Sequence, residues 1–560
     1  MSVLGKKWII RSKEQAKPIL DILLENRGLT TSKEKKEFLD IDETSSLSDP
    51  FEMPDMQKSV DRIMQAIANE ERIIVFGDYD VDGLTSTAIL FHTLKRLNAK
   101  HSARLPNREK DGYGLNKNFI DEFEKLEIKL IITVDCGVSC TKEISYAKEK
   151  GIETIITDHH TIPETPPTDA HAINHSTILT GAGVALKLAY ALFIHNLGQE
   201  AAEKEIEPLI ELAALGTVAD IGVAQGENRL IIKKGLKTLL TTTSPGLKIL
   251  KEVTGLAKRQ EKEISTTTIG YQLAPRINAA GRIGDPYIAL KLLIGENVEE
   301  LQKHGKKLEE LNQRRREMTQ ESYFQALDQF ENIEKQGGLP YILIATHPNW
   351  HVGIIGLTAA RLAERFGRPA IIMQDLGETL VASARSIEAF NVIEAIAAQK
   401  EHLVTFGGHK EAAGLTVLKK NYNKFRKAIE KYAKKKLKDK DLRPTLEIDC
   451  ELDSDQVTDD LIKEINKLKP FGVRNHRPLF IIRNAKPTFV ETVGREKSHV
   501  KFTANLKGQP KALNAIGFRL GEHAQTLRQQ AATDLICHID LNEWNGNKKL
   551  QLELVDFKSL

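Results

Sequence analysis

The chain has little that would tie it to a membrane or to an oxidising compartment. It contains 4 cysteines in 560 residues, none of them in a Cys-x-x-Cys pair. A reduced, cytoplasmic compartment is therefore expected. No run reaches the roughly 20 apolar residues of a membrane span. We also expect no secretory signal, because the first twelve residues lack an apolar core.

An excess of one charge is absent as well. The net charge is +3, with 28% charged and 41% hydrophobic residues, which is ordinary for a soluble enzyme. Any surface for nucleic acid must therefore be local and cannot come from a basic chain as a whole. The length predicts roughly three or four domains of about 150 residues each.

What the sequence does have is four carboxylate-rich patches in its first half. Crowded carboxylates repel one another unless cations neutralise them. Oxygen ligands with one or two imidazoles favour Mn²⁺ or Mg²⁺. A single Asp after a strand is more often a helix N-cap, but the whole set predicts a two-metal centre that attacks a phosphate ester. The patches are Gly-Asp-Tyr-Asp-Val-Asp-Gly at 77–83, Val-Asp-Cys-Gly at 134–137, Thr-Asp-His-His at 157–160 and Thr-Val-Ala-Asp at 217–220.

Residues 72–230 alternate β-type and α-type patterns. Continuous apolar strands between helices predict a parallel sheet that is covered on both faces. Ligands of such sheets bind at the carboxyl ends of the strands. Asp78, Asp135 and Asp158 each follow a strand, so we expect them to converge. The predicted strands cover 72–76, 130–134 and 154–157.

The fold class expected for the whole chain is α/β: two α/β domains joined by a long helix, followed by a small β-barrel. The long helix is predicted over 301–323, and the basic segment 419–443 is predicted to be an exposed helix with a linker. Barrel strands are expected at 445–452, 479–483, 499–504, 533–541 and 550–555. The expected parts are a helical cap (1–70), a catalytic domain (71–230), a helical connector (231–335), a substrate-binding domain (336–440) and the barrel (441–560).

The four patches, in this order, resemble the DHH phosphoesterase superfamily, which is named for its Asp-His-His. Later segments are similar to its RecJ family of single-strand-specific exonucleases, and the similarity covers nearly the whole chain. It implies a DHH domain, a DHHA1 domain and a barrel of the OB type. The later segments are Pro275-Arg-Ile-Asn-Ala-Ala-Gly-Arg282, Trp350-His-Val-Gly-Ile-Ile-Gly356, Ser383-Ala-Arg-Ser386 and Phe406-Gly-Gly-His-Lys-Glu-Ala-Ala-Gly414.

The resemblance assigns catalytic roles to eight residues of the patches. Two readings stay open for Asp78 and Asp158, which either bind metal or hold an imidazole in the right tautomer. His160 is expected to face the scissile phosphate. A histidine that some superfamily members carry before the first patch is Phe76 here. The implied ligands of two Mn²⁺ or Mg²⁺ ions are Asp80, Asp82, Asp135, His159 and Asp220.

Substrate binding is also implied by resemblance. Arg108 would reach the terminal 5′-phosphate, and Ser383 and Arg385 would complete that pocket, although a surface ion pair is the alternative for Arg385. A guanidinium fork suits a terminal phosphate. Ala382 and Ala384 stand where the family is richer in glycine.

Other segments carry two readings each. Gly407, Gly408 and His409 form either a cradle for the substrate backbone or a tight turn. Arg276 and Arg282 either line a narrow entry or support the core. The glycines of 180–183 are read as a helix start. In the barrel region, basic residues of 469–477 are expected to contact single strands.

The function implied is a metal-dependent exonuclease that degrades single-stranded DNA from its 5′ end to 5′-mononucleotides in repair and recombination. A helicase and a single-strand-binding protein are the expected partners, and the protein is expected to be a monomer. One alternative is a small-substrate DHH phosphatase or a family-II pyrophosphatase, but these are shorter and need no barrel. Another is a non-catalytic DNA-binding scaffold, which the intact ligand set argues against.

Overall fold

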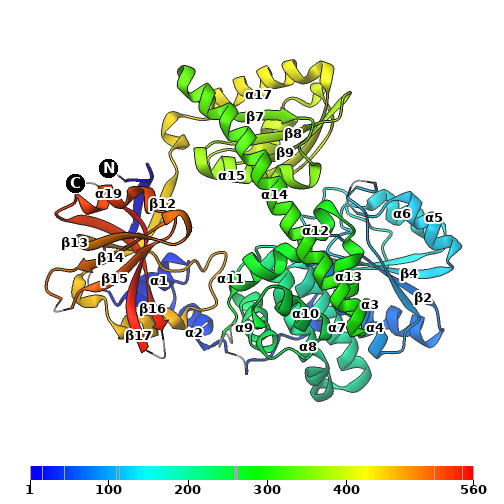
Figure 1. Ribbon diagram of the computed structural model, residues 1–560. Helices are drawn as coiled ribbons and strands as arrows, with labels where there is room; N and C mark the ends of the chain where they lie inside the picture. Colours follow the sequence, from blue (N-terminus) through cyan, green and yellow to red (C-terminus); the bar gives the residue numbers. More distant parts are fainter. Residues whose placement is uncertain are drawn as a thin grey trace. The chain divides into compact units, whose positions relative to one another are not determined.

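The computed structural model describes the chain except residues 1, 15–16, 43, 109, 113, 258–262, 510, 545–546 and 559–560, and gives only the backbone of 336–337, 543–544 and 547–548 (Figure 1). The chain divides into two compact units. One consists of Met1–Leu39, Met318–Lys469 and His476–Leu560, and the other of Asp40–Glu317 and Pro470–Asn475. Among the described residues, no helix has the length and apolarity needed to cross a bilayer.

The second unit is built on a five-stranded sheet in which every strand pair is parallel, as the sequence predicts. The strand order is β3-β2-β4-β5-β6, so the chain reverses its direction of winding between β2 and β4. This switch point is where an open α/β sheet forms a ligand crevice at its carboxyl edge. The strands are β2 (Arg72–Gly77), β3 (His101–Arg104), β4 (Ile128–Val134), β5 (Glu153–Asp158) and β6 (Ala172–His175).

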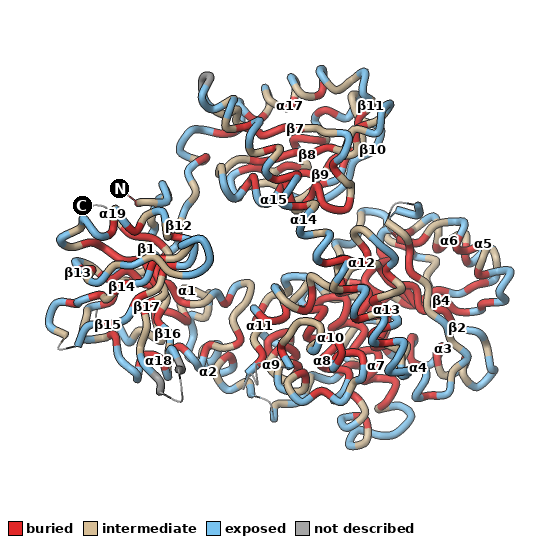
Figure 2. The backbone as a smooth tube through the Cα atoms, viewed as in Figure 1, coloured by how far each residue is buried: buried red, intermediate tan, exposed pale blue. Residues whose placement is uncertain are grey.

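Helices cover both faces of this sheet, so the residues of its central strands are mostly buried (Figure 2). Ile73 and Val75 of β2 pack with one set of helices, whereas Ile74 and Phe76 pack with the other. The first face is covered by α3 (Met56–Ala68), α4 (Val81–Arg96) and α7 (Gly181–Leu197), and the second by α5 (Lys117–Lys125) and α6 (Thr141–Glu149).

Helices continue from this layer to the end of the unit. The long connecting helix predicted over 301–323 is confirmed, because α14 spans the 40 residues Val298–Gly337. The others are α8 (Gln199–Ala219), α9 (Gly226–Leu240), α10 (Pro245–Val253), α11 (Thr266–Thr268), the π-helical turn η3 (Ile269–Leu273), α12 (Ala274–Ile283) and α13 (Pro286–Ile294).

The first unit contains the other α/β domain, which is built on a mixed five-stranded sheet with the order β10-β11-β9-β8-β7. Only β7 and β8 pair in parallel. In the basic segment, α17 (Tyr422–Lys436) buries Phe425, Ile429 and Ala433 and leaves its lysines toward solvent. The other elements are β7 (Leu343–His347), α15 (Val352–Phe366), β8 (Ala370–Asp375), β9 (Thr379–Arg385), α16 (Val392–Ala397), β10 (Leu403–Gly408) and β11 (Ala412–Leu418).

The C-terminal barrel is a ring of five strands in the order β13-β14-β15-β17-β16, closed by pairing of β16 with β13. This is the connectivity of an OB-fold, and it confirms the predicted barrel. Its elements are β13 (Phe480–Val493), β14 (His499–Asn505), β15 (Leu513–Gly517), α19 (Ala524–Arg528), β16 (Thr533–Trp544) and β17 (Asn547–Phe557), with α18 (Asp459–Lys467) before the ring.

Two expectations about strands need correction. β12 (Thr445–Leu452) lies outside the ring and extends the sheet beside β13, and the short strand β15 takes the place expected for it. Residues 1–70 are not helical throughout, because β1 (Lys7–Ser12) pairs in parallel with β12. A six-residue strand at a sheet edge has only a weak local signal, and its partner lies more than 400 residues away. The cap also contains α1 (Ile19–Asn26) and α2 (Ser32–Asp40).

Candidate metal centre

The first patch forms the turn between β2 and α4. Asp80 is the N-cap of α4, and its carboxylate accepts a hydrogen bond from the Gly83 amide at 3.1 Å. Gly83 cannot be larger, because an added Cβ would lie 2.6 Å from the Asp78 nitrogen. Asp80 is therefore both the N-cap of α4 and a member of the carboxylate cluster.

Asp82 lies in the first turn of α4 and is fully buried. Both of its oxygens accept hydrogen bonds from the start of α7, from Gly181 N at 2.7 Å and Ala182 N at 2.9 Å. The helix start predicted at 180–183 is confirmed, and helix N-termini favour anions. The sequence reasoning missed that these amides bind a carboxylate of the first patch, although the small residues Gly-Ala-Gly were a signal of close approach.

Asp135 follows β4 in the left-handed region, with φ 57°. Its amide donates to Thr157 O at 3.0 Å, which ties the second patch to the third. The side chain lies against Gly181, where an added Cβ would be 2.5 Å from Asp135 Cβ and 2.6 Å from its Oδ1. Gly181 thus holds Asp82 through its amide and leaves room for Asp135.

We expect Gly181→Ala to displace Asp135 and to weaken Mn²⁺ binding, since the new methyl group would overlap the carboxylate. Overpacking of this kind destabilises a protein by about 1–3 kcal/mol. The matched control is Gly183→Ala in the same helix turn, where the three atoms nearest to an added Cβ all belong to the Leu179 side chain, at 3.1 Å or more. Calorimetric titration with Mn²⁺ should separate the two variants, and wild-type affinity in Gly181→Ala would contradict this arrangement.

His159 brings the patches together. Its Nε2 lies 3.1 Å from Asp135 Oδ1, 3.6 Å from Asp220 Oδ2 and 3.8 Å from Asp82 Oδ2. Burial, together with the positive charge of His160, lowers the pKa of His159 to about 4, so the imidazole is neutral at physiological pH. A neutral nitrogen that faces three carboxylates is suited to bind a cation and not a proton.

Asp158 and His160 form a separate hydrogen-bonded pair. Asp158 Oδ1 accepts from His160 Nδ1 at 2.8 Å and from the amides of His159 and His160, and its Oδ2 accepts from Val138 N at 3.0 Å. Burial alone would raise the pKa of Asp158, but the hydrogen bonds from His160 outweigh it and lower the pKa. Burial opposes protonation of His160, whereas its bond to Asp158 raises the pKa of the imidazole.

Asp158→Asn should lower activity by about 10- to 100-fold, as is usual when a residue that orients a ligand or an imidazole is changed. The pKa of His160 should fall with the loss of its carboxylate partner, which NMR titration of the ring would show. Mn²⁺ binding should persist. Asp169→Asn is the control, because Asp169 pairs with Lys148 on the surface. Loss of Mn²⁺ binding in Asp158→Asn would instead make Asp158 a ligand.

Four other carboxylates of the cluster are strongly destabilised as anions. Burial, and then the charge of Asp80, raise the pKa of Asp78 to about 8 and that of Asp220 to about 7. Burial and the surrounding carboxylates raise the pKa values of Asp82 and Asp135 well above the usual range. Bound cations would relieve this repulsion.

The donor set fits hard divalent cations. Three groups of residues each bring their ligand atoms within 4.8 Å of one another. Within the described part of the chain, the buried atoms His159 Nε2 and Asp78 Oδ1 make no hydrogen bond. Carboxylate oxygens with imidazole nitrogens are typical of Mn²⁺ and Mg²⁺ sites. The groups are Asp82, His159 and Asp220; Asp135, His159 and His160; and Asp78, Asp80 and Asp135.

Two of the predicted arginines lie beside this cluster. The Arg108 guanidinium lies 4.4 Å from the centre of the Tyr79 ring. Burial, and then Asp78, raise the pKa of Tyr79 to about 12, while the charges of Arg108 and Arg282 act in the opposite direction. Gly281 packs against the Tyr79 carbonyl, so α12 brings Arg282 to the first patch.

Arg276 does not share this position. Its guanidinium forms an ion pair with Glu309 of α14 and donates to Gln272 O at 2.6 Å. These contacts fit the alternative reading, in which Arg276 supports the packing of α12.

Ser383, Arg385 and the glycine-rich segment lie together in the other unit. Arg385 donates to Ser383 Oγ at 3.1 Å and to Ala384 O at 2.8 Å. Ser383 pairs with Gly414, and Gly414 pairs with Gly407, so two glycines continue the face of the sheet on which Ser383 lies. Gly408 has φ 140°, and the His409 amide closes the hairpin onto Ala412 O at 2.8 Å. The tight turn and an open, side-chain-poor surface are therefore both present.

One of the basic residues expected to bind DNA at 469–477, Arg477, forms ion pairs within the protein. Arg477 pairs with Asp540 at 2.9 Å and with Glu553 at 2.6 Å. The segment Pro470–Asn475 belongs to the unit of the metal centre, where Arg229 and Thr266 donate to its carbonyl groups. The carbonyl groups of Pro470 and Phe471 therefore bind the protein itself, and the expectation that basic residues of 469–477 contact single strands stays a prediction.

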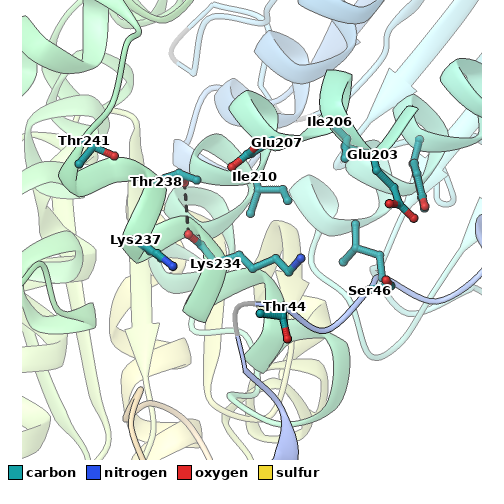
Figure 3. Close-up of a pocket in the computed structure, with 12 residues that line it drawn as sticks. Thr44, Ser46, Glu203, Ile206, Glu207, Ile210, Lys234, Lys237, Thr238 and Thr241 are labelled. Carbon is teal, nitrogen blue, oxygen red and sulfur yellow. Dashed lines mark hydrogen bonds between the residues drawn. The ribbon is translucent and has the colours of Figure 1, made fainter. Parts of the chain in front are cut away.

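A separate cavity of about 340 Å³ lies between α8, α9 and residues 44–47 (Figure 3). Lys234 and Lys237 of α9 line it together with Glu203 and Glu207 of α8. It shares no residue with the metal-binding groups, and its charges of opposite sign favour no single class of ligand.

The fold and this centre define a DHH-type, metal-dependent phosphoesterase. Three family descriptions match in order: the DHH family N-terminal domain (residues 72–217), the DHHA1 domain (339–435) and the RecJ OB domain (448–556).

Characterised relatives are similar over almost the whole chain. The single-stranded-DNA-specific exonuclease RecJ of Bacillus subtilis is 36% identical, with 98% of this chain and 70% of the relative covered. The Escherichia coli RecJ is 30% identical, over 96% and 95% of the two chains. The crystal structure of Thermus thermophilus RecJ with Mn²⁺ has a TM-score of 0.83 at 26% identity, covering 99% of this chain and 80% of that one. Its Mg²⁺ complex has a TM-score of 0.77 at 25% identity. The chain belongs to the RecJ family.

Proposed function

We propose that this protein hydrolyses single-stranded DNA from the 5′ end and releases 5′-mononucleotides. The observation that carries the proposal is His159 Nε2 surrounded by three carboxylates at the switch point of the parallel sheet. The RecJ relatives, whose names specify single-stranded DNA, support the substrate class. Salt should weaken binding, because contacts to the DNA backbone release counterions.

We propose that the site binds two ions, either Mn²⁺ or Mg²⁺. Each of these metals occurs in a crystal structure of Thermus thermophilus RecJ. When bound, they supply an activated water and neutralise charge on the phosphoryl oxygens. The neutral imidazole of His159 and the amide-anchored carboxylate of Asp82 preorganise the site. The proposed ligands are Asp80, Asp82, Asp135, His159 and Asp220, and Asp78 is positioned to complete one group.

The other residues act on the substrate and on one another. Asp158 orients His160, and in the imidazolium form of His160 the Nε2 proton can be donated to a phosphoryl oxygen. Arg108 and Arg282 place positive charge beside the first patch, which suits the 5′ end of a strand. Ser383 and Arg385 are proposed to bind the 5′-phosphate, and Gly407, Gly408 and His409 the following backbone. Arg276 is assigned support of α12.

The wider assignments follow from the family. We propose roles in DNA repair and recombination, with a helicase and a single-strand-binding protein as partners and a monomer as the active form. The five-part division at about residues 70, 230, 335 and 440 is our working definition of the domains. The four cysteines are free and buried, which supports work in a reducing compartment such as the cytoplasm.

The experiment uses a 5′-phosphorylated single-stranded oligonucleotide labelled at its 3′ end, with Mn²⁺, beside a 5′-blocked copy and a blunt duplex. A ladder from the free single strand alone is the expected result. Cleavage only of di- to pentanucleotides would indicate a small-substrate phosphatase. A DNA-binding scaffold would cleave nothing and would bind Mn²⁺ no better than the double variant Asp80→Ala, Asp82→Ala.

A further inference from the structure

Ile221 comes directly after Asp220 and has a strained backbone, with φ 61°. A β-branched residue is rare in this left-handed region, because its side chain crowds the carbonyl group. The strain arises where α8 ends. Gly222 N donates to Thr217 O at 2.9 Å and Ile221 N to Val218 O at 3.3 Å. This is the Schellman ending of a helix, in which glycine usually holds the position of Ile221.

The flanking chain keeps this backbone in place. An added Cβ on Gly222 would lie 2.7 Å from Thr180 Cγ2, so Gly222 is tightly packed. Beyond it, Ala224 N donates to Val473 O at 3.0 Å. The helix holds one side of Ile221 and the Pro470–Asn475 segment holds the other, so the strain does not relax.

The Ile221 side chain contributes little to the core. It is 70% exposed, although a large apolar side chain is usually buried. It also borders the candidate centre, since Asp220 Oδ2 lies 3.6 Å from His159 Nε2. A strained backbone that presents an apolar group to solvent beside a reaction centre indicates a role in function and not in folding.

We propose that Ile221 is a substrate-positioning residue whose side chain packs against the base of the nucleotide at the scissile phosphate. The inference rests on the proposed function and names a contact at that same site. Packing on the face of a base is tolerant of sequence, as degradation of any strand requires. In a duplex the face of that base is covered by its stacked neighbours, so the contact also favours single strands.

The test compares Ile221→Gly with Glu127→Gly. Glu127 has φ 56°, is exposed, and precedes β4 at the end of the sheet opposite Asp135. Glycine relieves the same strain at both positions, so neither variant should have a lower Tm than wild type. Ile221→Gly should raise KM for a single-stranded oligonucleotide by about 5- to 10-fold with little change in kcat, the loss expected for a partly buried isoleucine contact. Glu127→Gly should keep wild-type kinetics, and Ile221→Met should restore KM.

A second substrate separates base contact from an indirect effect. On an oligonucleotide with abasic 5′-terminal positions, wild type and Ile221→Gly should have equal KM. A KM increase that persists there, a loss of Mn²⁺ affinity in Ile221→Gly, or an unchanged KM on the normal strand would each overturn the inference while leaving the exonuclease intact. A wild-type protein that neither cleaves DNA nor binds Mn²⁺ would instead refute the proposed function, and this inference with it.

Discussion

Asp135→Asn should abolish most activity while leaving the fold intact. Asparagine is among the residues that tolerate the left-handed backbone of this position, so the β4 turn should be retained. The substitution removes a buried carboxyl group whose pKa is raised by burial and by Asp82. The metal-free variant should therefore be at least as stable as the metal-free wild type. Without the central carboxylate, we expect kcat to fall by at least about 10²–10³-fold, comparable to the loss of one electrostatic stabiliser of a transition state.

The measurement combines single-strand cleavage with thermal unfolding in EDTA. The control is Asp121→Asn, on the surface of α5, where Asp121 accepts a hydrogen bond from Tyr146. It should be nearly as active as wild type. An Asp135→Asn variant that keeps more than about a tenth of wild-type kcat would show that the carboxylate is not a metal ligand.

The stabilisation of the protein by Mn²⁺ should increase with pH. In the unfolded chain an Asp titrates near 4, whereas burial raises the pKa of Asp78 to about 8 and that of Asp220 to about 7. The folded, metal-free protein therefore binds protons more tightly than the unfolded chain. The contribution of these two groups therefore makes its stability fall as pH rises from about 4 to about 8.

Mn²⁺ needs the same carboxylates without protons, so its binding tightens with pH by about tenfold per unit for each proton released. Saturation about 100-fold above Kd adds about 2.7 kcal/mol of stability. The Mn²⁺-induced rise in Tm should thus be much larger at about pH 8 than at about pH 6. Asp135→Asn should show little of this pH dependence. An Mn²⁺ effect that is equal at both pH values would contradict the assignment of these carboxylates as ligands.

The parts of this protein that could be predicted are those with a local signal. Continuous apolar strands indicate a parallel sheet, and the topology of such a sheet brings its carboxyl ends to one edge. Asp78, Asp135 and Asp158 follow three of those strands, so their convergence could be inferred without coordinates. The helix start at 180–183 and the long helix α14 also have clear local patterns.

The parts that could not be predicted depend on long-range pairing. Asp82 and Gly181 are 99 residues apart, and no local pattern specifies their hydrogen bond. β1 pairs with β12, which is more than 400 residues away in the sequence, and β15 is only five residues long. Arginine is a residue type that often contacts DNA, but Arg477 is paired with two carboxylates from strands distant in the sequence. Charge in a sequence does not show whether the protein itself neutralises it.

The most direct test of the account is an anomalous difference map from crystals soaked in Mn²⁺. Two peaks should appear among the carboxylates at the carboxyl edge of the parallel sheet, one beside His159 Nε2 and one beside Asp78 and Asp80. Crystals of Asp135→Asn should lose at least one of them. No peak at this edge, in crystals of a protein that degrades single-stranded DNA in solution, would contradict the proposed two-metal centre.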